Sequence, residues 1–349
     1  MKIALNSLFL QTPNSGSGQY LLHLLRAIKE IDQQNEYLLL GPRPVKRDSS
    51  GNIPFPYQVN PVPTLAGRNE NIEKLVWEQH SGPAAARKAG ARVKAYMRLV
   101  ARAARNATLI ITVSQHARQD MMDALHLPAE RICVTYEAAG DQYRPIADPA
   151  ALSQARARYG VGERYIFYLG GLDQRKNVPQ LVRAFAHLYK QLEQPDLQLL
   201  ISGNPDKQKG PLFPDPRPVA AELGVSGQVI CRFIQDEDKP AMYSGTSLFV
   251  FPSLYEGFGL DPLEAMSCGA PVVCSNRTSL PEVVGDAALS VDPEDTQALV
   301  EAMRSVLSDT SLAIDLRARS LLRAAQFSWR KTATETLAAY QEALARSKK

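Results

Sequence analysis

One stretch in the C-terminal half decides how the fold is assigned: LFVFPSLYEGFGLDPLE, residues 248–264. Its first four residues are apolar and have the length of a short buried strand, whereas Pro262 suits the first turn of a helix. Glycines lie between the two, where they let the backbone approach a ligand closely. Ligands of parallel α/β sheets bind beyond the carboxyl ends of the strands. The passage therefore predicts a ligand site between strand and helix, with a helix N-terminus suited to a phosphate.

Around this stretch, short apolar runs alternate with amphipathic segments through the C-terminal half. Besides 248–251, strands are predicted at 165–169, 197–202, 229–233, 271–274 and 288–291. The clearest helices are predicted at 178–192 and 296–307, and two more at 309–345, with the break at Phe327-Ser328-Trp329. This alternation favours a buried parallel sheet with helices on both faces.

The N-terminal half starts in the same way but offers fewer strands. A strand is expected at 2–5, then a glycine loop at 16–18 and a helix at 19–31. Further strands are predicted at 37–40, 57–60, 109–113 and 132–135, and helices at 71–89 and 93–105. We therefore expect an α/β protein with an N-terminal domain at 1–145, a second domain at 146–327, and a last helix at 328–349. This helix is expected to pack back toward the N-terminal domain.

Composition excludes several other classes of protein. The 349 residues are 45% hydrophobic and 22% charged, which is ordinary globular usage. No apolar run approaches the roughly 20 residues of a membrane helix, and no signal peptide is expected, because the apolar run after Met1 is short. The four cysteines lack metal or redox spacing and are expected to be buried free thiols. A cytoplasmic protein of two α/β domains fits these features.

The net charge of +4 is unevenly distributed. Residues 81–119 hold eight Lys or Arg and no Asp or Glu, most of them within 87–105. Two interpretations stay open: peripheral contact with an anionic membrane surface, or an ordinary solvated helix face. Nucleic acid is not an expected partner, because the stretch has no interleaved aromatic residues and no known reader motif.

Two acidic residues of the deciding stretch are candidates for ligand binding. Glu256 and Glu264 are eight positions apart across a loop-to-helix turn, so that they can reach different hydroxyls of one ligand. The alternative is that Glu264 complements the helix dipole and Glu256 is a solvated loop residue.

Two other loops follow predicted strands and are candidate anion sites. In GGLDQRKN, residues 170–177, Arg175 and Lys176 can neutralise a diphosphate, although adjacent bases on a loop are often only solvent-facing. The loop Gly16-Ser17-Gly18 is a weaker signal, because it lacks the spacing of the dinucleotide-binding motif.

Taken together, these segments resemble the family-4 retaining glycosyltransferases, whose GT-B fold has two Rossmann-like domains facing a cleft. Three strings carry most of the resemblance: FVFPSLYEGFGLDPLEAM at 249–266, LGGLDQRKN at 169–177 and SCGAPVVCSN at 267–276. Further matches are LPEVVGDAA at 280–288, FSW at 327–329, GSGQY at 16–20, IITVS at 110–114 and PAERICV at 128–134. Overall similarity leans toward the bacterial polysaccharide mannosyltransferases.

The resemblance implies roles for individual residues. Glu256 would contact the hydroxyls of the donor sugar, Glu264 would hold the nucleotide ribose, and Arg175 and Lys176 would bind the diphosphate and stabilise the departing nucleotide. The implied catalytic residues are Lys176, Arg175 and Glu256. The implied donor-binding residues are Gly16, Gly18, Gly171, Gly257, Phe258, Gly259, Leu260 and Glu264.

The resemblance also implies the reaction. It would transfer a hexosyl group, mannosyl by overall similarity, with retention of configuration. The donor would be a nucleoside-diphosphate sugar with GDP or UDP, and the acceptor a glycan, a lipid-linked or a small molecule. No cofactor and no metal would be needed.

One departure from the family's pattern matters. Relatives carry two more strands and a His-Asp pair before the helix predicted at 93–105, but none of the five histidines here precedes an aspartate. The N-terminal domain is therefore expected to lack two strands near residues 90–94. Three explanations stay open: the segment exists in the protein but is absent from this sequence, it has been deleted, or this half has been reorganised around a different loop.

The shortened domain leaves two further expectations open. A bare sheet edge would favour a homodimer. A catalytically impaired protein that still binds nucleotide sugars is the alternative to an active transferase. A phosphorylase or epimerase on the same fold is a weaker third candidate.

Overall fold

The computed structural model describes residues 2–6, 8–11, 16–41, 54–59, 101–192, 194–208 and 210–347. The chain divides into two compact units. Unit 1 comprises Met1–Val113, Arg118–Glu137 and Ser328–Lys349, and unit 2 comprises Ser114–Ala117 and Ala138–Phe327. The division at Ala138 lies a few residues before the expected boundary at 145, and the last helix groups with unit 1.

Unit 2 contains a six-stranded parallel sheet with the order β11-β10-β9-β6-β7-β8. The strands are β6 (Tyr165–Leu169), β7 (Gln198–Ser202), β8 (Val229–Arg232), β9 (Leu248–Phe251), β10 (Val272–Ser275) and β11 (Leu289–Val291). This is the doubly wound order, in which the strand order reverses between β6 and β9. The six predicted strands are all present, with ends shifted by a residue at most.

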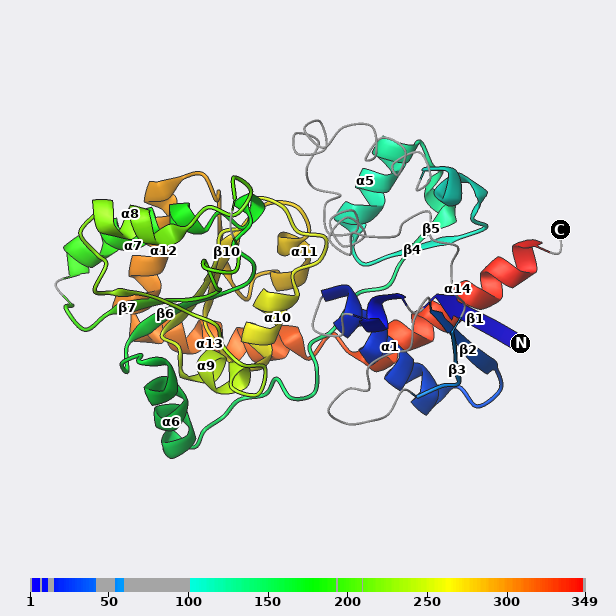
Figure 1. Ribbon diagram of the computed structural model, residues 1–349, viewed down its shortest axis with the longest axis horizontal. Coiled ribbons are helices and arrows are strands. Elements are labelled where there is room, and N and C mark those ends of the chain that lie inside the picture. Colours follow the sequence, from blue (N-terminus) through cyan, green and yellow to red (C-terminus); the bar gives the residue numbers. More distant parts are fainter. Residues whose placement is uncertain are drawn as a thin grey trace. The chain divides into compact units, whose positions relative to one another are not determined.

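Helices cover both faces of this sheet (Figure 1). Helices α7, α8 and α12 lie together on one side, and α9, α10 and α13 on the other. The helices of unit 2 are α6 (Pro149–Tyr159), α7 (Val178–Leu192), α8 (Pro216–Glu222), α9 (Lys239–Gly245), α10 (Leu260–Ser267), α11 (Leu280–Val284), α12 (Thr296–Ser308) and α13 (Thr310–Ala324). The core is aromatic at its centre, where the ring of Phe167 meets those of Tyr243 and Phe249 edge-on.

Local sequence signals explain where several helices begin. Asp148 precedes α6 and accepts a hydrogen bond from the Ala150 amide, and Pro149 occupies the first helical position. Asp295 and Asp309 cap α12 and α13 in the same way. Such caps satisfy amide groups that the helix itself leaves without a partner.

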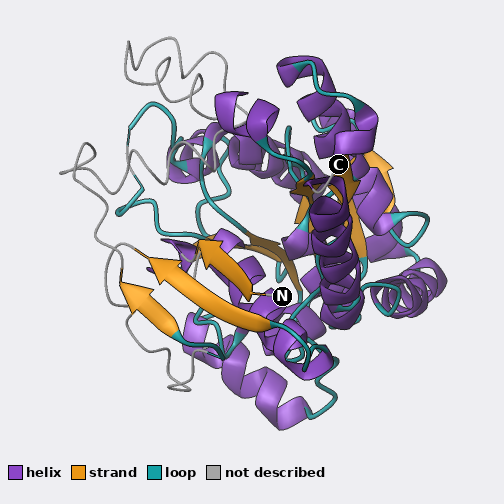
Figure 2. Ribbon diagram, turned by 90° about the vertical axis from the view of Figure 1, so that its right-hand side faces the viewer, coloured by secondary structure: helices purple, strands orange, loops and turns teal. Residues whose placement is uncertain are grey.

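In the described residues of unit 1, the strands form two small parallel sheets. Strands β1 (Lys2–Asn6), β2 (Glu36–Gly41) and β3 (Tyr57–Val59) form one, and Figure 2 shows them side by side. Strands β4 (Ile110–Thr112) and β5 (Ile132–Val134) form the other. The helices with described bounds are α1 (Gly16–Ile31), α5 (Gln115–Leu125) and α14 (Trp329–Ser347), with short 3-10 turns at Leu8–Gln11 and Ala129–Arg131.

Helix α14 packs against α1 through Trp329. The Trp329 ring stacks on His23 at 5.2 Å and meets Tyr20 edge-on at 5.8 Å. Thr332 Oγ1, one turn later, donates to the Tyr136 carbonyl at 2.5 Å. These contacts tie the end of the chain to unit 1.

Two sequence-based expectations need correction. Helix α1 begins at Gly16 rather than at Gln19, so the glycines form the first turn of the helix and not a loop before it. Cys268 and Cys274 are buried as expected, but Cys133 and Cys231 are only half-buried. Cys133 lies in the small β4-β5 sheet and Cys231 in the edge strand β8, where cover is incomplete.

Several other expectations fall outside the described residues. These are the helix at 71–89, the shortening near 90–94 and most of the basic stretch 87–105. Within the described part of that stretch, residues 101–106 are helical, and Arg102 and Arg105 are exposed. No helix among the described residues is long and apolar enough to cross a membrane.

Candidate active site

The candidate residues come together because two neighbouring strands end at the same edge of the sheet. Strand β6 leads through the turn Gln174–Lys176 into α7, and β9 leads through residues 252–259 into α10. The strands are paired in parallel, with Phe167 opposite Phe249. The Leu254 amide then donates to the Arg175 carbonyl at 2.7 Å, which joins the two loops directly.

Glu256 is the centre of a group of ion pairs. Its Oε1 lies 2.7 Å from Lys176 Nζ, and its Oε2 lies 3.2 Å from Arg175 Nη1. Ser253 Oγ donates to Oε1 at 2.5 Å. The side chains of Lys176 and Glu256 are only 8% and 10% exposed, so these charges are largely removed from water.

Acidic neighbours hold the two bases in place. Lys176 Nζ also lies 3.7 Å from Asp261 Oδ2, and it sits 4.7 Å from the centre of the Phe251 ring. Arg175 Nε pairs with Asp173 Oδ1 at 3.0 Å. Neither Asp173 nor Asp261 has a predicted role, because neither carries a spacing signal of its own.

The charge state of Glu256 follows from these contacts. Burial alone would raise the pKa of Glu256, but the positive charges of Lys176 and Arg175 outweigh it and hold the pKa below its usual value. The pKa of Arg175, which burial would lower, is raised by Glu256 and Asp173. Glu256 and Arg175 are therefore both ionised at neutral pH.

Glu264 lies in a different environment on α10. The Tyr243 hydroxyl donates to its Oε2 at 3.3 Å, and Tyr143 also hydrogen-bonds to it. Burial, with the nearby charge of Asp261, raises the pKa of Glu264 to about 8. Glu264 thus holds a proton at neutral pH, whereas Glu256 does not.

Both tyrosines lacked a signal in the sequence. Tyr143 belongs to the linker before α6, and Tyr243 belongs to the short helix α9. No local periodicity connects either of them with Glu264. Only the folded chain brings them together, with ring centres 6.0 Å apart.

The glycine-rich loop between β9 and α10 contains the remaining candidates of this unit. Gly257 is exposed, Phe258 is buried, and Leu260 begins α10. Gly259 has a φ of 120°, a backbone conformation that favours glycine. Gly171 lies in the neighbouring loop beside Asp173. Gly16 and Gly18 lie in the first turn of α1, in unit 1.

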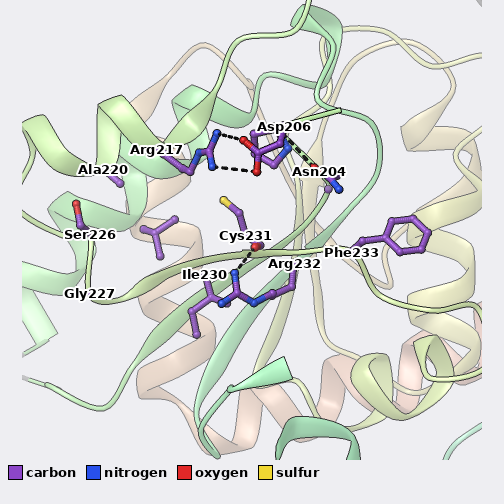
Figure 3. A pocket seen from close by; sticks show the side chains of 13 residues that line it. Asn204, Asp206, Arg217, Ala220, Ser226, Gly227, Ile230, Cys231, Arg232 and Phe233 are labelled. Carbon is purple, nitrogen blue, oxygen red and sulfur yellow. Dashed lines mark hydrogen bonds and ion pairs between the residues drawn. The ribbon is translucent and has the colours of Figure 1, made fainter. Parts of the chain in front are cut away.

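A separate pocket of about 590 Å³ lies along the edge strand β8, next to α8 (Figure 3). Arg217 points across it to Asp206, and the Cys231 sulfur points toward this pair. Arg217 also pairs with Asp215, so its charge is already neutralised by two carboxylates. None of the residues that surround Lys176 or Glu264 lines the pocket.

Across the described residues, no group of three or more His, Cys, Asp or Glu side chains is arranged to hold a metal ion.

Comparison with known proteins supports one assignment. The family described as glycosyl transferases group 1 matches residues 154–322. The chain is 38% identical to the O-antigen chain mannosyltransferase B of Escherichia coli over 239 residues, which are 68% of this chain and 61% of that protein. It is 34% identical to the serotype-specific mannosyltransferase WbdA of the same species over 65% of this chain, but spans only 28% of that longer protein.

A third relative is matched over more of its length. It is the GDP-mannose-dependent alpha-(1-6)-phosphatidylinositol monomannoside mannosyltransferase of Mycolicibacterium smegmatis, 31% identical over 71% of this chain and 72% of that protein. Among solved structures, sucrose-phosphate synthase from Thermosynechococcus elongatus has the same fold, with a TM-score of 0.71, 21% identity and 99% of both chains covered. The GT-B fold expected from the sequence is confirmed, and the chain belongs to the glycosyl transferases of group 1.

Proposed function

We propose that this chain is a retaining glycosyltransferase that moves a hexosyl group from a nucleoside-diphosphate sugar to a glycan or lipid-linked acceptor. The observation that carries the proposal is the ion-paired group of Lys176, Arg175 and Glu256, in which Lys176 and Glu256 are buried, at the point where the strand order reverses. This is where ligands of doubly wound sheets bind. The two bases suit the phosphates of a ligand and Glu256 suits its hydroxyls, while Asp173 and Asp261 hold the bases in place.

In this proposal, Arg175 and Lys176 bind the diphosphate of the donor. Negative charge builds up on the phosphate when the bond between the sugar and the phosphate oxygen breaks, because that oxygen keeps the electron pair. Positive groups fixed in a site that excludes water stabilise such charge most strongly. The ion pairs with Glu256, Asp173 and Asp261 keep both bases in position before the donor binds.

The two glutamates differ in what they offer to a ligand. Ionised Glu256 accepts hydrogen bonds from sugar hydroxyls and opposes positive charge on the sugar carbon. Protonated Glu264 can both donate to and accept from the ribose hydroxyls. The contrast in protonation state supports two different contacts on one donor molecule.

We further propose GDP-mannose as the donor. This choice is supported by the relatives, since the Escherichia coli proteins are named mannosyltransferases and the Mycolicibacterium protein is named GDP-mannose-dependent.

Thermal unfolding in the presence of GDP-mannose, GDP-glucose, UDP-glucose and GDP tests the donor first. A ligand that binds the folded state stabilises it by RT ln(1 + [L]/Kd), so the true donor gives the largest rise in melting temperature. No rise with any of the four would contradict the proposed donor class.

Turnover is then followed as release of GDP from GDP-mannose, with oligomannosides offered as acceptors. The anomeric configuration of the product, read by NMR, tests retention. Binding without turnover would instead favour the catalytically impaired nucleotide-sugar-binding protein.

A further inference from the structure

Three side-chain hydroxyls form hydrogen bonds with the backbone of the loop that carries Glu256. Thr278 Oγ1 accepts a hydrogen bond from the Glu256 amide at 3.1 Å. Ser279 Oγ lies 3.0 Å from the Glu256 carbonyl and 2.6 Å from the Phe258 carbonyl. Ser114, in the same unit, donates to the Gly257 carbonyl at 2.7 Å. We call Thr278, Ser279 and Ser114 the hydroxyl clamp.

The hydroxyl clamp acts on backbone groups and not on the carboxylate itself. It engages three consecutive carbonyls, at residues 256, 257 and 258, together with one amide. Ser114 and Ser279 are fully buried, so these bonds are shielded from competing water. The side chain of Glu256 can then leave the loop in only a narrow range of directions.

Thr278 has an unusual backbone. Its φ is 58°, in the left-handed region that β-branched residues rarely adopt. Such a conformation persists only where the surrounding structure fixes it, and it concentrates at functional sites. Here it lies between β10 and α11 and places Oγ1 within reach of the Glu256 amide.

Packing supports the same arrangement. Leu280, the next residue but one, is fully buried against Gly259, where an added Cβ would lie 2.7 Å from Leu280 Cδ2. One short segment, residues 278–280, therefore contacts the second half of the loop, at Glu256, Phe258 and Gly259.

We propose that Thr278 and Ser279 are positioning residues, which set the direction of the Glu256 carboxylate toward Lys176, Arg175 and the reacting sugar. The inference rests on the proposed function, because it states that the hydroxyl clamp contributes to the rate of the reaction as well as to the stability of the fold. A displacement of about 1 Å in a reacting group can lower a rate about 100-fold, so the backbone of this loop is a sensitive point.

The test compares substitutions at Thr278 in the full chain. Thr278→Val keeps the shape of the side chain and removes the acceptor, Thr278→Ser keeps the acceptor, and Thr310→Val on the exposed start of α13 is the control. We expect Thr278→Val to lower kcat for GDP release by about 10-fold to 100-fold with an unchanged KM for the donor. Thr278→Ser and Thr310→Val should keep the rate of the wild-type protein.

Stability is measured on the same variants to separate positioning from folding. If Thr278→Val fails to fold, Thr278→Gly replaces it, because glycine adopts the left-handed conformation without strain. The same fall in kcat is then expected from a stably folded protein. A folded variant without the hydroxyl that keeps the kcat of the wild-type protein would overturn the inference.

A double-mutant cycle with Glu256→Gln distinguishes the two proposals. If Thr278 acts through Glu256, then Thr278→Val has little further effect once Glu256 is replaced. Full additivity of the two losses overturns the positioning role and leaves the proposed function intact. If Glu256→Gln alone keeps the wild-type rate, the proposed role of Glu256 is wrong, and the inference fails with it.

Discussion

Lys176 and Glu256 form an ion pair of 2.7 Å although eighty positions separate them in the sequence. Each follows one of two neighbouring strands, β6 and β9, and both side chains are almost completely buried. A buried charge is tolerated only beside a partner of opposite charge, so each of these two residues needs the other in the folded protein. The same pair that would bind the donor therefore also stabilises the fold.

Removing the positive charge should destabilise the protein. Lys176→Met leaves Glu256 buried with Arg175 as its remaining cationic partner. We expect a loss of about 2–3 kcal/mol in the free energy of unfolding at pH 7, below the roughly 3–5 kcal/mol of a fully broken buried pair. Urea unfolding measures it. The double variant Lys176→Met/Glu256→Gln should recover part of the loss, and an equal loss in both would show that the unpaired charge is not its cause.

The pH dependence of stability should carry the signature of Glu264. Its pKa is raised to about 8 in the folded protein from an ordinary value of 4.5. Between these values the unfolded chain releases the proton while the folded chain retains it. Since the folded state then binds more protons, the free energy of unfolding falls as the pH rises from about 4.5 to about 8 and levels off above this range.

Urea unfolding at intervals between pH 5 and pH 9 measures this effect. Glu264→Gln, which cannot ionise, should make the slope shallower in this range, while Glu137, whose pKa burial also raises to about 8, keeps its own contribution. The matched control is Glu222→Gln, at an exposed position at the end of α8, which should keep the slope of the wild-type protein. A slope that is the same in all three proteins would contradict the raised pKa.

Much of unit 2 could be predicted because its elements are delimited locally. Strands β6 and β9 and helix α7 have the predicted ends, since apolar runs there stop at glycine, proline or polar residues. The rule for strand ends predicted ligand sites after both strands, but the direct ion pair between Lys176 and Glu256 was not predicted and is seen only in the structure. The surroundings of Glu264 could not be predicted, because Tyr143 and Tyr243 reach it from segments that are distant in sequence.

The start of α1 shows a different kind of error. Glycine in a helix interior is unfavourable, which favours a loop at Gly16 and Gly18. At the first turn of a helix this cost is small, since several amide groups there have no helical partner in any case. The helix consequently starts three residues before the predicted position.

Kinetics should show that Lys176 acts on the transition state. Lys176→Ala should lower kcat more than it raises KM for GDP-mannose, because charge on the leaving phosphate develops only as the reaction proceeds. Steady-state rates of GDP release measure both constants. Lys190→Ala, in the last turn of α7, provides a control for the loss of a lysine. A change in KM alone would count against the proposed role.

Binding measurements should show that Glu264 contacts the donor. Glu264→Ala removes a group that can hydrogen-bond the ribose, and we expect donor affinity to fall by about 1–3 kcal/mol. Isothermal titration calorimetry with GDP-mannose measures this change at pH 7. The same variant should lose affinity for GDP as well, since the proposed contact lies on the nucleotide. Unchanged affinity for both ligands would contradict the ribose contact.

The two glycines of the loop between β9 and α10 should respond differently to alanine. At Gly257 an added Cβ meets nothing within 4 Å, and the residue does not have the positive φ of its neighbour. At Gly259 the Cβ would lie 2.7 Å from Leu280 Cδ2, in a backbone with a φ of 120°. Gly259→Ala should therefore destabilise the fold by more than about 1 kcal/mol, whereas Gly257→Ala should change the free energy of unfolding by less than about 0.5 kcal/mol.

If the donor occupies the open space at Gly257, then Gly257→Ala should nevertheless weaken the binding of GDP-mannose, and it should weaken the binding of GDP less. Urea unfolding measures the stability of both variants, and calorimetry measures their affinity for the two ligands. A stable Gly257→Ala protein with full affinity for GDP-mannose would show that the sugar does not bind at Gly257.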